Sequence, residues 1–455
     1  MIVMNQEKVE AGVQGELFKR RRSEIPDAER VQALQEKLYQ KAKQESAYKF
    51  YVLYDKMFIP YMLREAWKSV KANGGAPGVD GMTIEEVGKY GVESYLKELG
   101  EDLRKQTYQP QAVKRVMIPK ANGGERPLGI PTVRDRIAQT VCKMILEPIF
   151  EADFEESSYG FRPGRSSKDA MKAIRENLRE GRTAVYDADL SKYFDTIPHD
   201  KLQIALKERV TDPRMLKLIN KWLKVSVWEN GKLTSGKKND KGTPQGGVIS
   251  PLLANVYLHL LDRIVNNARS LFAKHGVRII RYADDFVLMG RTLPAEITGK
   301  LKNLLDRMGL TINETKTRQI DARIDSFNFL GFTIRYDKDL KGRGSRYWNI
   351  MPSKKSEQKI RDKVREFLST HGHYKAKDVA TGLNIITRGW LNYFDIKGVS
   401  YPAMSKRRLR FYLYDKLIRY YNRKSQRKCK LYGQKAFEVL RARYGLIDPV
   451  LYASR

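Results

Sequence analysis

Short apolar runs separated by polar joints mark the middle of the chain. The runs Val277 to Arg281 and Phe286 to Gly290 meet at Tyr282-Ala283-Asp284-Asp285. This pattern predicts a β-hairpin whose tip carries two adjacent carboxylates. An earlier run, Thr183 to Leu190, is also rich in β-forming residues and predicts a further strand.

The acidic residues in these runs are poorly explained by packing. The strand period of two places Asp187 and Asp189 on one side of the predicted strand, where burying unpaired carboxylates is costly. Mg²⁺ takes hard oxygen ligands, and a pair of metal ions bridged by aspartates is a common arrangement for phosphoryl transfer. Two other interpretations remain open: a turn in which Asp284 and Asp285 hydrogen-bond locally, and a strand end with solvated carboxylates.

A glycine-rich loop lies between the acidic segments. It reads Gly242-Thr243-Pro244-Gln245-Gly246-Gly247, and glycines allow a backbone to approach a ligand closely. The following Ser250-Pro251 is typical of a helix N-cap and first helical position. The loop would present Gln245 in a cleft beside the acidic strands, although a plain loop-to-helix joint has the same pattern.

A second hairpin is predicted upstream. The runs Val113 to Lys120 and Glu125 to Ile130 flank Ala121-Asn122-Gly123-Gly124. Its arms carry Lys120 and Arg126, cations that could clamp a triphosphate. Cations on a hairpin are also often simply solvated, so this pattern alone leaves both interpretations open.

Helical periodicity is strongest near the two ends of the chain. It predicts helices over Ala28 to Gln44, Lys354 to Leu368, Val379 to Trp390 and Lys406 to Tyr421. The last of these interleaves Lys and Arg with aromatic residues that include Phe411, Tyr412, Tyr414 and Tyr420. A helix of this kind can follow a phosphate backbone with its basic face, while its rings pack in a core or stack on bases.

These motifs, in this order, resemble those of a reverse transcriptase, and more narrowly the reverse transcriptase/maturase encoded by bacterial group II introns. The resemblance covers about residues 50 to 425. The segments that carry it are the basic hairpin, the acidic strand with Phe194, the Gly242 to Gly247 loop, Tyr282 to Asp285, Gly309 to Thr317, Phe327 to Phe332, Asn73 to Gly81, Ser158 to Arg165 and Arg388 to Phe394.

The resemblance implies an α+β right-hand polymerase, with fingers, a palm bearing an antiparallel sheet, and a following α-helical thumb. It implies that Asp189, Asp284 and Asp285 are the catalytic residues and hold two Mg²⁺ ions, for which Mn²⁺ could substitute. Asp187 would then be a strand neighbour and not a ligand.

Further site residues are implied in the same way. Phe194 matches the steric gate that excludes the ribonucleotide 2′-hydroxyl, although Tyr193-Phe194 could also be ordinary core aromatics. The residues expected at the nucleotide are Lys120, Arg126, Phe194, Gln245 and Lys316. The residues expected at nucleic acid are Arg162, Arg165, Arg388, Trp390, Lys406, Arg407, Arg408 and Arg410.

The charge of the chain agrees with a polyanionic partner. The 455 residues carry a net charge of +33. From Lys341 to Arg455 there are 28 Lys and Arg against 8 Asp and Glu, a net +20. The resemblance implies that this region is the thumb and maturase region, which would grip the primer duplex and structured intron RNA through phosphates and 2′-hydroxyls.

We expect the following division of the chain. The segments are a polar, loosely attached leader (1–48), an N-terminal extension (49–105), fingers and palm (106–335), a thumb/maturase domain (345–425), and a short basic segment with a possible role in DNA binding (426–455). No endonuclease domain is expected.

Other sequence features narrow the location. No apolar stretch near 18 residues and no signal-peptide pattern occurs, so neither a membrane span nor secretion is supported. Cys142 and Cys429 are the only cysteines, too few for a disulfide framework or a four-cysteine zinc site. Reduced thiols are consistent with a cytoplasmic protein.

The leading functional interpretation is an RNA-directed DNA polymerase that also binds its intron RNA. It would assist splicing and support intron mobility by target-primed reverse transcription, with intron RNA, RNA template, DNA primer or target and dNTPs as partners. Two alternatives stay open: a splicing or RNA-binding factor whose polymerase is vestigial, and a domesticated reverse transcriptase serving phage defence or CRISPR spacer acquisition.

Overall fold

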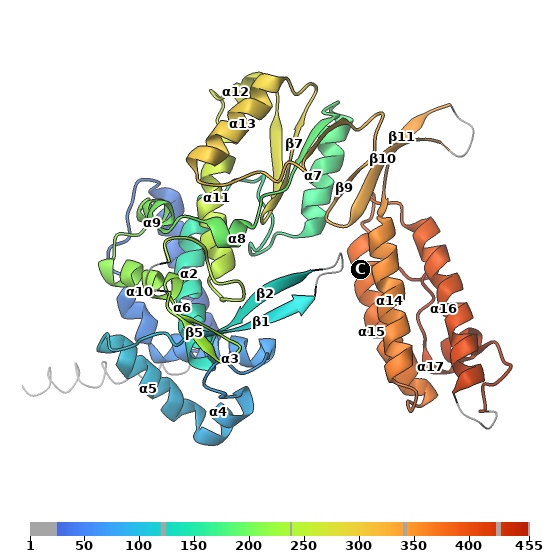
Figure 1. The fold of residues 1–455 in the computed structure, drawn as a ribbon, viewed down its shortest axis with the longest axis horizontal. Coiled ribbons are helices and arrows are strands. Elements are labelled where there is room, and N and C mark those ends of the chain that lie inside the picture. The colour runs from blue at the N-terminus through green and yellow to red at the C-terminus, as the bar shows by residue number, and fades with distance from the viewer. Residues whose placement is uncertain (1–24, 120–123, 237–238, 340–343, 425–428, 454–455) are drawn as a thin grey trace, which may run out of the picture.

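An antiparallel sheet, here called the central sheet, carries the acidic motifs (Figure 1). The computed structural model describes residues 25–119, 124–236, 239–339, 344–424 and 429–453, and the fold is mixed α/β. The strand order is β6-β7-β3-β8. The strands are β3 (Ala184–Ala188), β6 (Arg278–Tyr282), β7 (Asp285–Gly290) and β8 (Arg318–Asp321). The predicted acidic strand and the predicted hairpin are therefore confirmed.

Strand β7, which lies inside the central sheet, is buried on both faces. Phe286 and Leu288 of β7 belong to the larger core, which the N-terminal helices share. Val287 and Met289 belong to a second core, which includes residues of helix α7 (Ser167–Arg179). A strand buried on both faces needs such a continuous apolar run, as this sequence has.

A second sheet contains the predicted upstream hairpin, and we call it the upstream sheet. Its order is β2-β1-β4-β5, with Ile118 opposite Arg126 in the antiparallel β1–β2 pair. Its strands are β1 (Val113–Pro119), β2 (Glu125–Ile130), β4 (Val227–Glu229) and β5 (Lys232–Thr234).

Helices surround the two sheets. They are η1 (Tyr54–Phe58), α3 (Pro60–Asn73), α4 (Ile84–Tyr90), α5 (Val92–Arg104), α6 (Val133–Glu151), α8 (Tyr193–Thr196), α9 (His199–Lys207), α10 (Pro213–Leu223), α11 (Ser250–Asn266), α12 (Leu271–Lys274) and α13 (Ala295–Arg307). Helix α11 begins one residue earlier than expected, because Ile249 is its N-cap and Ser250 is already helical. The Ser250 hydroxyl instead donates to the Pro244 carbonyl, 2.8 Å away, and so closes the glycine-rich loop.

The N-terminal helix α2 (Asp27–Gln44) corrects the expectation of a loosely attached leader. Val31, Leu38 and Ala42 are buried in the larger core. The Arg209 guanidinium donates to the Ala42 carbonyl at 2.8 Å. The described part of the predicted leader is therefore an integral part of the fold, and residues 1–24 lie outside the described residues.

A small sheet joins the central sheet to the C-terminal helices (Figure 1). Its order is β11-β10-β9, formed by β9 (Phe327–Phe329), β10 (Phe332–Lys338) and β11 (Arg346–Pro352). The C-terminal helices are α14 (Lys354–Thr370), α15 (Ala376–Phe394), α16 (Ala403–Arg423) and α17 (Ala436–Tyr444). The helices predicted in this region are confirmed, each a few residues longer than expected.

Helix α17 changes the expected division of the chain. Ala436, Phe437 and Leu440 are buried in one core with Leu413 and Leu417 of α16. Residues 426–455 were expected to form a separate basic segment, but their described part packs within the preceding helical domain.

The described residues include no helix that is both long and apolar enough to cross a membrane. Cys142 and Cys429 are both free thiols, and Cys142 is buried.

Candidate active site

The acidic residues converge at one edge of the central sheet. In the β6–β7 hairpin Tyr282 pairs with Asp285, so Ala283 and Asp284 form the two-residue loop. Strand β3 pairs with β7 so that Ala188 lies opposite Phe286. Asp189 follows Ala188 and Asp285 precedes Phe286, so these two aspartates occupy adjoining ends of paired strands.

The side of the sheet on which they lie follows from the same register. Side chains alternate between the two faces of a strand, so Asp189 lies on the same face as Val185 and Asp285 on the same face as Val287. Both valine side chains enter the second core. Residues opposite each other in an antiparallel pair have Cα atoms about 4.5 to 5.5 Å apart, so both carboxylates start from neighbouring positions on one face.

The carboxylates are close enough to perturb one another. Burial, followed by the negative charges of Asp284 and Asp189, raises the pKa of Asp285 to about 7, although part of its side chain is exposed. Burial is also the main cause that raises the pKa of Asp284, while Arg126 acts to lower it. Burial and then Asp189 raise the pKa of Asp187 to about 6. Such mutual repulsion favours a bound cation.

The residues present fit a divalent metal ion. Their donors are hard carboxylate oxygens. Within the described ranges no three acidic, His or Cys side chains converge closely enough to hold a metal by themselves. Mg²⁺ usually binds through one or two protein carboxylates and completes its shell with water and substrate phosphates, so this arrangement suits a site that the substrate completes.

Lys316 lies directly against the acidic cluster. Its Nζ donates to Asp189 Oδ2 at 3.0 Å, and its side chain is 65% exposed. The Asp189 backbone is also held in place, because its carbonyl accepts from the Asn313 amide at 2.8 Å. An exposed lysine on a carboxylate can exchange that partner for a phosphate at little cost.

Arg126 and Gln245 meet across the site. The Arg126 Nε donates to Gln245 Oε1 at 2.9 Å, and Gln245 Nε2 donates to Asp195 Oδ1 at 3.0 Å. The glycine-rich loop is bonded to β2, since the Gly129 amide donates to the Gln245 carbonyl at 2.6 Å. A Cβ at Gly246 would lie 2.3 Å from the Gly129 carbonyl oxygen, which explains the need for glycine.

Asp195 is a residue that sequence reasoning missed. It orients the Gln245 amide so that the oxygen faces Arg126, and the only signal in the sequence was its position next to Phe194. A cavity of about 360 Å³ between the upstream sheet and the glycine-rich loop is lined by residues that include Arg115, Asp195 and Gln245.

The two adjacent aromatics have different environments. Tyr193 is buried and its hydroxyl donates to the Ala254 carbonyl at 2.6 Å, so it is a core residue. Phe194 is half-buried, with its ring edge-on to Tyr193 at 5.5 Å. Lys120, the other residue expected at the nucleotide, lies outside the described residues.

The prediction that Arg162 contacts nucleic acid is wrong. Its side chain is 2% exposed and pairs with Glu151 at 2.7 Å. Its guanidinium also donates to the carbonyls of Glu155 and Ser158. Arg162 therefore holds its own loop together. Arg165 is half-exposed and pairs with Glu156, which leaves its predicted role untested.

The basic residues of the C-terminal helices that are predicted to contact nucleic acid differ in exposure and in their ion pairs. Arg388 and Arg407 are exposed, and Arg408 is exposed beside Glu357. Lys406 is different, because it pairs with Asp395 at 2.5 Å and its side chain is 12% exposed. This ion pair argues against a contact with nucleic acid, and the role expected of Lys406 stays a prediction.

The other two residues predicted in this region are tied to the fold. Arg410 is half-buried and pairs with Asp448 at 3.4 Å. The Trp390 ring packs against two cores, which limits its use for base stacking.

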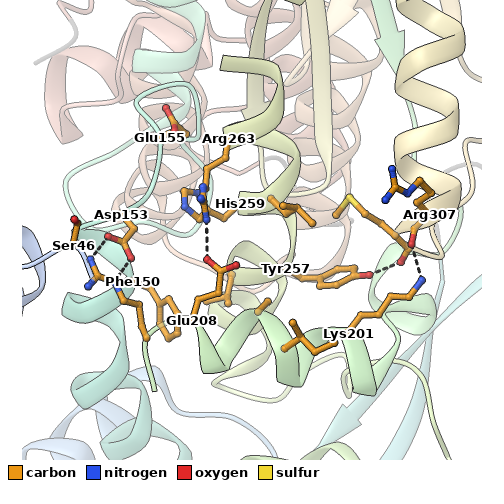
Figure 2. Close-up of a pocket in the computed structure, with 16 residues that line it drawn as sticks. Ser46, Phe150, Asp153, Glu155, Lys201, Glu208, Tyr257, His259, Arg263 and Arg307 are labelled. Carbon is orange, nitrogen blue, oxygen red and sulfur yellow. Dashed lines mark hydrogen bonds and ion pairs between the residues drawn. The ribbon is translucent and has the colours of Figure 1, made fainter. Parts of the chain in front are cut away.

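A separate cavity of about 460 Å³ lies between α9 and α11 (Figure 2). None of the three candidate catalytic aspartates lines it. Ion pairs flank it, with Arg209 on Asp153 at 2.5 Å and Arg263 on Glu208 at 2.8 Å. We therefore keep this cavity apart from the candidate active site.

Comparisons with known proteins define the class of this molecule. Residues 118–334 match the family of reverse transcriptases (RNA-dependent DNA polymerases). Residues 357–436 match the maturase-specific domain of group II introns. The first match contains the acidic cluster and the second covers most of the C-terminal helices.

The chain belongs to the family of reverse transcriptases and maturases encoded by group II introns. It is 36% identical over 315 residues to protein YkfC of Escherichia coli, which is 60% of this chain and 80% of that protein. It is 37% identical over 225 residues to the group II intron-encoded protein LtrA of Lactococcus lactis, which is 49% of this chain and 37% of LtrA.

A further relative is an uncharacterized 91 kDa protein in the cob intron of Schizosaccharomyces pombe. It is 30% identical over 360 residues, which is 67% of this chain and 43% of that protein. The chain thus spans less than half the length of this relative and of LtrA.

Proposed function

We propose that this protein is an RNA-directed DNA polymerase that also binds its group II intron RNA, assisting splicing and supporting intron mobility by target-primed reverse transcription. Its partners would be the intron RNA, an RNA template, a DNA primer or target, and dNTPs, with the cytoplasm as its location. The central sheet would be the palm, the upstream sheet and nearby helices the fingers, and the C-terminal helices the thumb.

One observation carries the polymerase proposal. The pairing of β3 with β7 puts Asp189 and Asp285 at adjoining strand ends, beside the Asp284 of the hairpin loop. We infer that these three residues hold two Mg²⁺ ions, for which Mn²⁺ could substitute. When bound, the ions would lower the pKa of the primer 3′-hydroxyl and neutralise charge on the transferring phosphate.

The protein's own residues would position the nucleotide. Arg126, oriented by Gln245, would contact the triphosphate as a planar donor, and Lys316 would move from Asp189 to the leaving pyrophosphate. Phe194 would exclude the 2′-hydroxyl of a ribonucleotide. Most of the rate acceleration would then come from orientation and electrostatic stabilisation.

The test is primer extension on an RNA template with Mg²⁺ and dNTPs. We expect Asp284→Ala and Asp285→Ala to abolish extension while binding of intron RNA stays near the wild-type level. Asp325→Ala is the matched control, because Asp325 is exposed on the loop that follows β8. Extension that persisted in both active-site variants would refute the proposal.

The same assay separates an alternative of another class. A wild-type protein that bound and helped to splice intron RNA, yet failed to extend any primer, would be a splicing factor with a vestigial polymerase. In that case the two aspartate variants would splice as well as the wild type.

A further inference from the structure

A fully buried ion pair adjoins the loop of the β6–β7 hairpin. Arg281, in strand β6, and Asp262, in helix α11, both have side chains with 0% exposure. The Arg281 Nε lies 2.9 Å from Asp262 Oδ1, and its Nη2 lies 2.5 Å from Oδ2. The two residues therefore form a two-pronged pair that fixes the plane of the guanidinium.

The remaining arginine nitrogen reaches the hairpin loop itself. Arg281 Nη1 donates to the Ala283 carbonyl at 2.8 Å and to Asn255 Oδ1 at 2.8 Å. Ala283 has φ = 59°, a left-handed conformation that is uncommon for a residue with a Cβ. The guanidinium thus bonds to the peptide group that joins Ala283 to Asp284.

Asn255 extends this contact to a second segment. Its Nδ2 donates to the Gly160 carbonyl at 2.8 Å. The backbone beside Gly160 runs along β6, since the Tyr159 amide donates to the Arg281 carbonyl at 2.9 Å. A Cβ at Gly160 would lie only 2.3 Å from the Ala283 nitrogen. The hairpin loop is therefore held by hydrogen bonds from the arginine and is in close contact with residues 159–160.

Stability alone is a weak reason for such a pair. Desolvating two charges often costs as much as their attraction returns, and buried pairs can be replaced by apolar residues of similar size with little loss of stability. A network that binds the backbone of a strained loop has another use, because it fixes where the following side chains point.

We propose that Arg281, Asp262 and Asn255 are positioning residues that hold the Asp284–Asp285 tip in its productive geometry for nucleotidyl transfer. Asp262 orients the arginine, Asn255 ties it to residue 160, and the arginine holds the loop. This inference depends on the proposed polymerase function, and it adds residues that touch neither substrate nor metal.

The test replaces the ion pair by apolar side chains, Arg281→Met together with Asp262→Leu. We expect a folded protein whose thermal stability is lowered, because the Ala283 carbonyl and the Asn255 side chain lose their donor. Its rate of primer extension at saturating dNTP should fall about 100-fold, a loss that a 1 Å misplacement can cause. The KM for dNTP and the affinity for intron RNA should stay within a few fold. Arg281→Lys should also be impaired, because lysine keeps the charge but cannot make the planar contacts.

A second ion pair, whose arginine is buried, is the matched control. Arg209 and Asp153 have side chains with 4% and 27% exposure, and both line the separate cavity. Arg209→Met with Asp153→Leu should lower thermal stability, since Arg209 also donates to the Ala42 carbonyl. Extension by the folded fraction should remain at the wild-type rate.

The outcomes distinguish this inference from the proposed function. If the wild type extends primers and the Arg281/Asp262 double variant extends them equally fast, the positioning role is refuted and the polymerase stands. If the double variant does not fold, Asn255→Ser provides the same comparison with a smaller change.

Hydrogen exchange of the hairpin supplies a readout that does not need activity. Loss of the network should speed amide exchange in the peptide over residues 279–286 by about tenfold, which corresponds to about 1.4 kcal/mol of local stability. Unchanged exchange in a folded double variant would refute the proposal even if the wild type showed no polymerase activity.

Discussion

Gly160 offers a direct way to displace the hairpin that carries Asp284 and Asp285 without changing a charged group. Its φ does not lie in the left-handed region, so alanine suits the backbone conformation. The Cβ of an alanine, however, would not fit beside the hairpin loop. An added Cβ would lie 2.3 Å from the Ala283 nitrogen, 2.9 Å from the Tyr282 carbonyl carbon and 3.1 Å from the Ala283 Cα.

The size of the effect follows from these contacts. Non-bonded heavy atoms prefer about 3.5 to 4.0 Å, so the loop or residue 160 must shift by about 1 Å. All three neighbouring atoms belong to the backbone, so no side chain can rotate away. Overpacking of this kind costs about 1 to 3 kcal/mol, more than the ~0.4 to 1 kcal/mol that alanine gains by restricting the unfolded chain.

We therefore expect Gly160→Ala to lower the free energy of unfolding by about 1.3 kcal/mol, the difference between the midpoints of these two ranges. We also expect it to slow primer extension by about 100-fold, because the shift falls on the residues that precede Asp284. Single-turnover extension at saturating dNTP and denaturant unfolding measure the two effects separately.

Gly299→Ala is the matched control. Gly299 is exposed within α13, and a Cβ there would meet nothing within 4 Å. This change should stabilise the helix by about 0.5 to 1 kcal/mol and leave extension unchanged. If Gly160→Ala extended primers within about threefold of the wild type, roughly 0.65 kcal/mol, the close contact would not control the hairpin and the reasoning would fail.

Three further predictions test individual residues. Phe194→Ala should raise the use of rNTPs relative to dNTPs on the order of tenfold, about 1.4 kcal/mol of lost discrimination, in competitive extension assays; an unchanged ratio would reject the steric gate. Arg407→Ala should make the slope of log affinity for intron RNA against log salt shallower by about 0.7 to 0.9, as expected for one lost phosphate contact. Arg162→Ala should lower the free energy of unfolding by about 3 to 5 kcal/mol, because it leaves Glu151 as an uncompensated charge in a largely buried pair.

The strands and the hairpin between β6 and β7 could be predicted from the sequence because their signals are local. Apolar residues with the period of a strand, interrupted by a short polar joint, gave β6 and β7 within a residue of their observed bounds. The convergence of Asp189 with Asp285 could not be derived in the same way. It depends on the pairing of β3 with β7, and the resemblance to a known family supplied that expectation.

The buried network around Arg281 also had a signal that was not used. An arginine inside an apolar strand and an aspartate inside an apolar helix each need a partner, because neither can be buried alone. The sequence marks both residues as anomalous, but it does not say that they meet. The pairing of Arg281 with Asp262 is a property of the packing of α11 against β6.

Charge was the least reliable guide to function, and the reason is physical. Arg162 and Lys406 have the same sequence appearance as Arg388 and Arg407, yet the first two are held by carboxylates of the fold. A basic residue whose partner is distant in sequence looks like a free cation until the partner is located. The helix predicted over Ala28 to Gln44 is confirmed as α2, but its loose attachment was a misjudgement, because a mostly charged helix needs only one apolar stripe to pack against a core.

The differences in exposure and pairing among these basic residues indicate which of them can contribute most to RNA binding. A cation that already pairs with a buried carboxylate must lose that partner before it can bind a phosphate, so its net gain is small. An exposed cation loses only water and counterions, and their release favours binding. Arg388 and Arg407 are exposed, whereas Lys406 and Arg410 contact Asp395 and Asp448. Among these four residues, the salt dependence of RNA binding should therefore come mainly from Arg388 and Arg407.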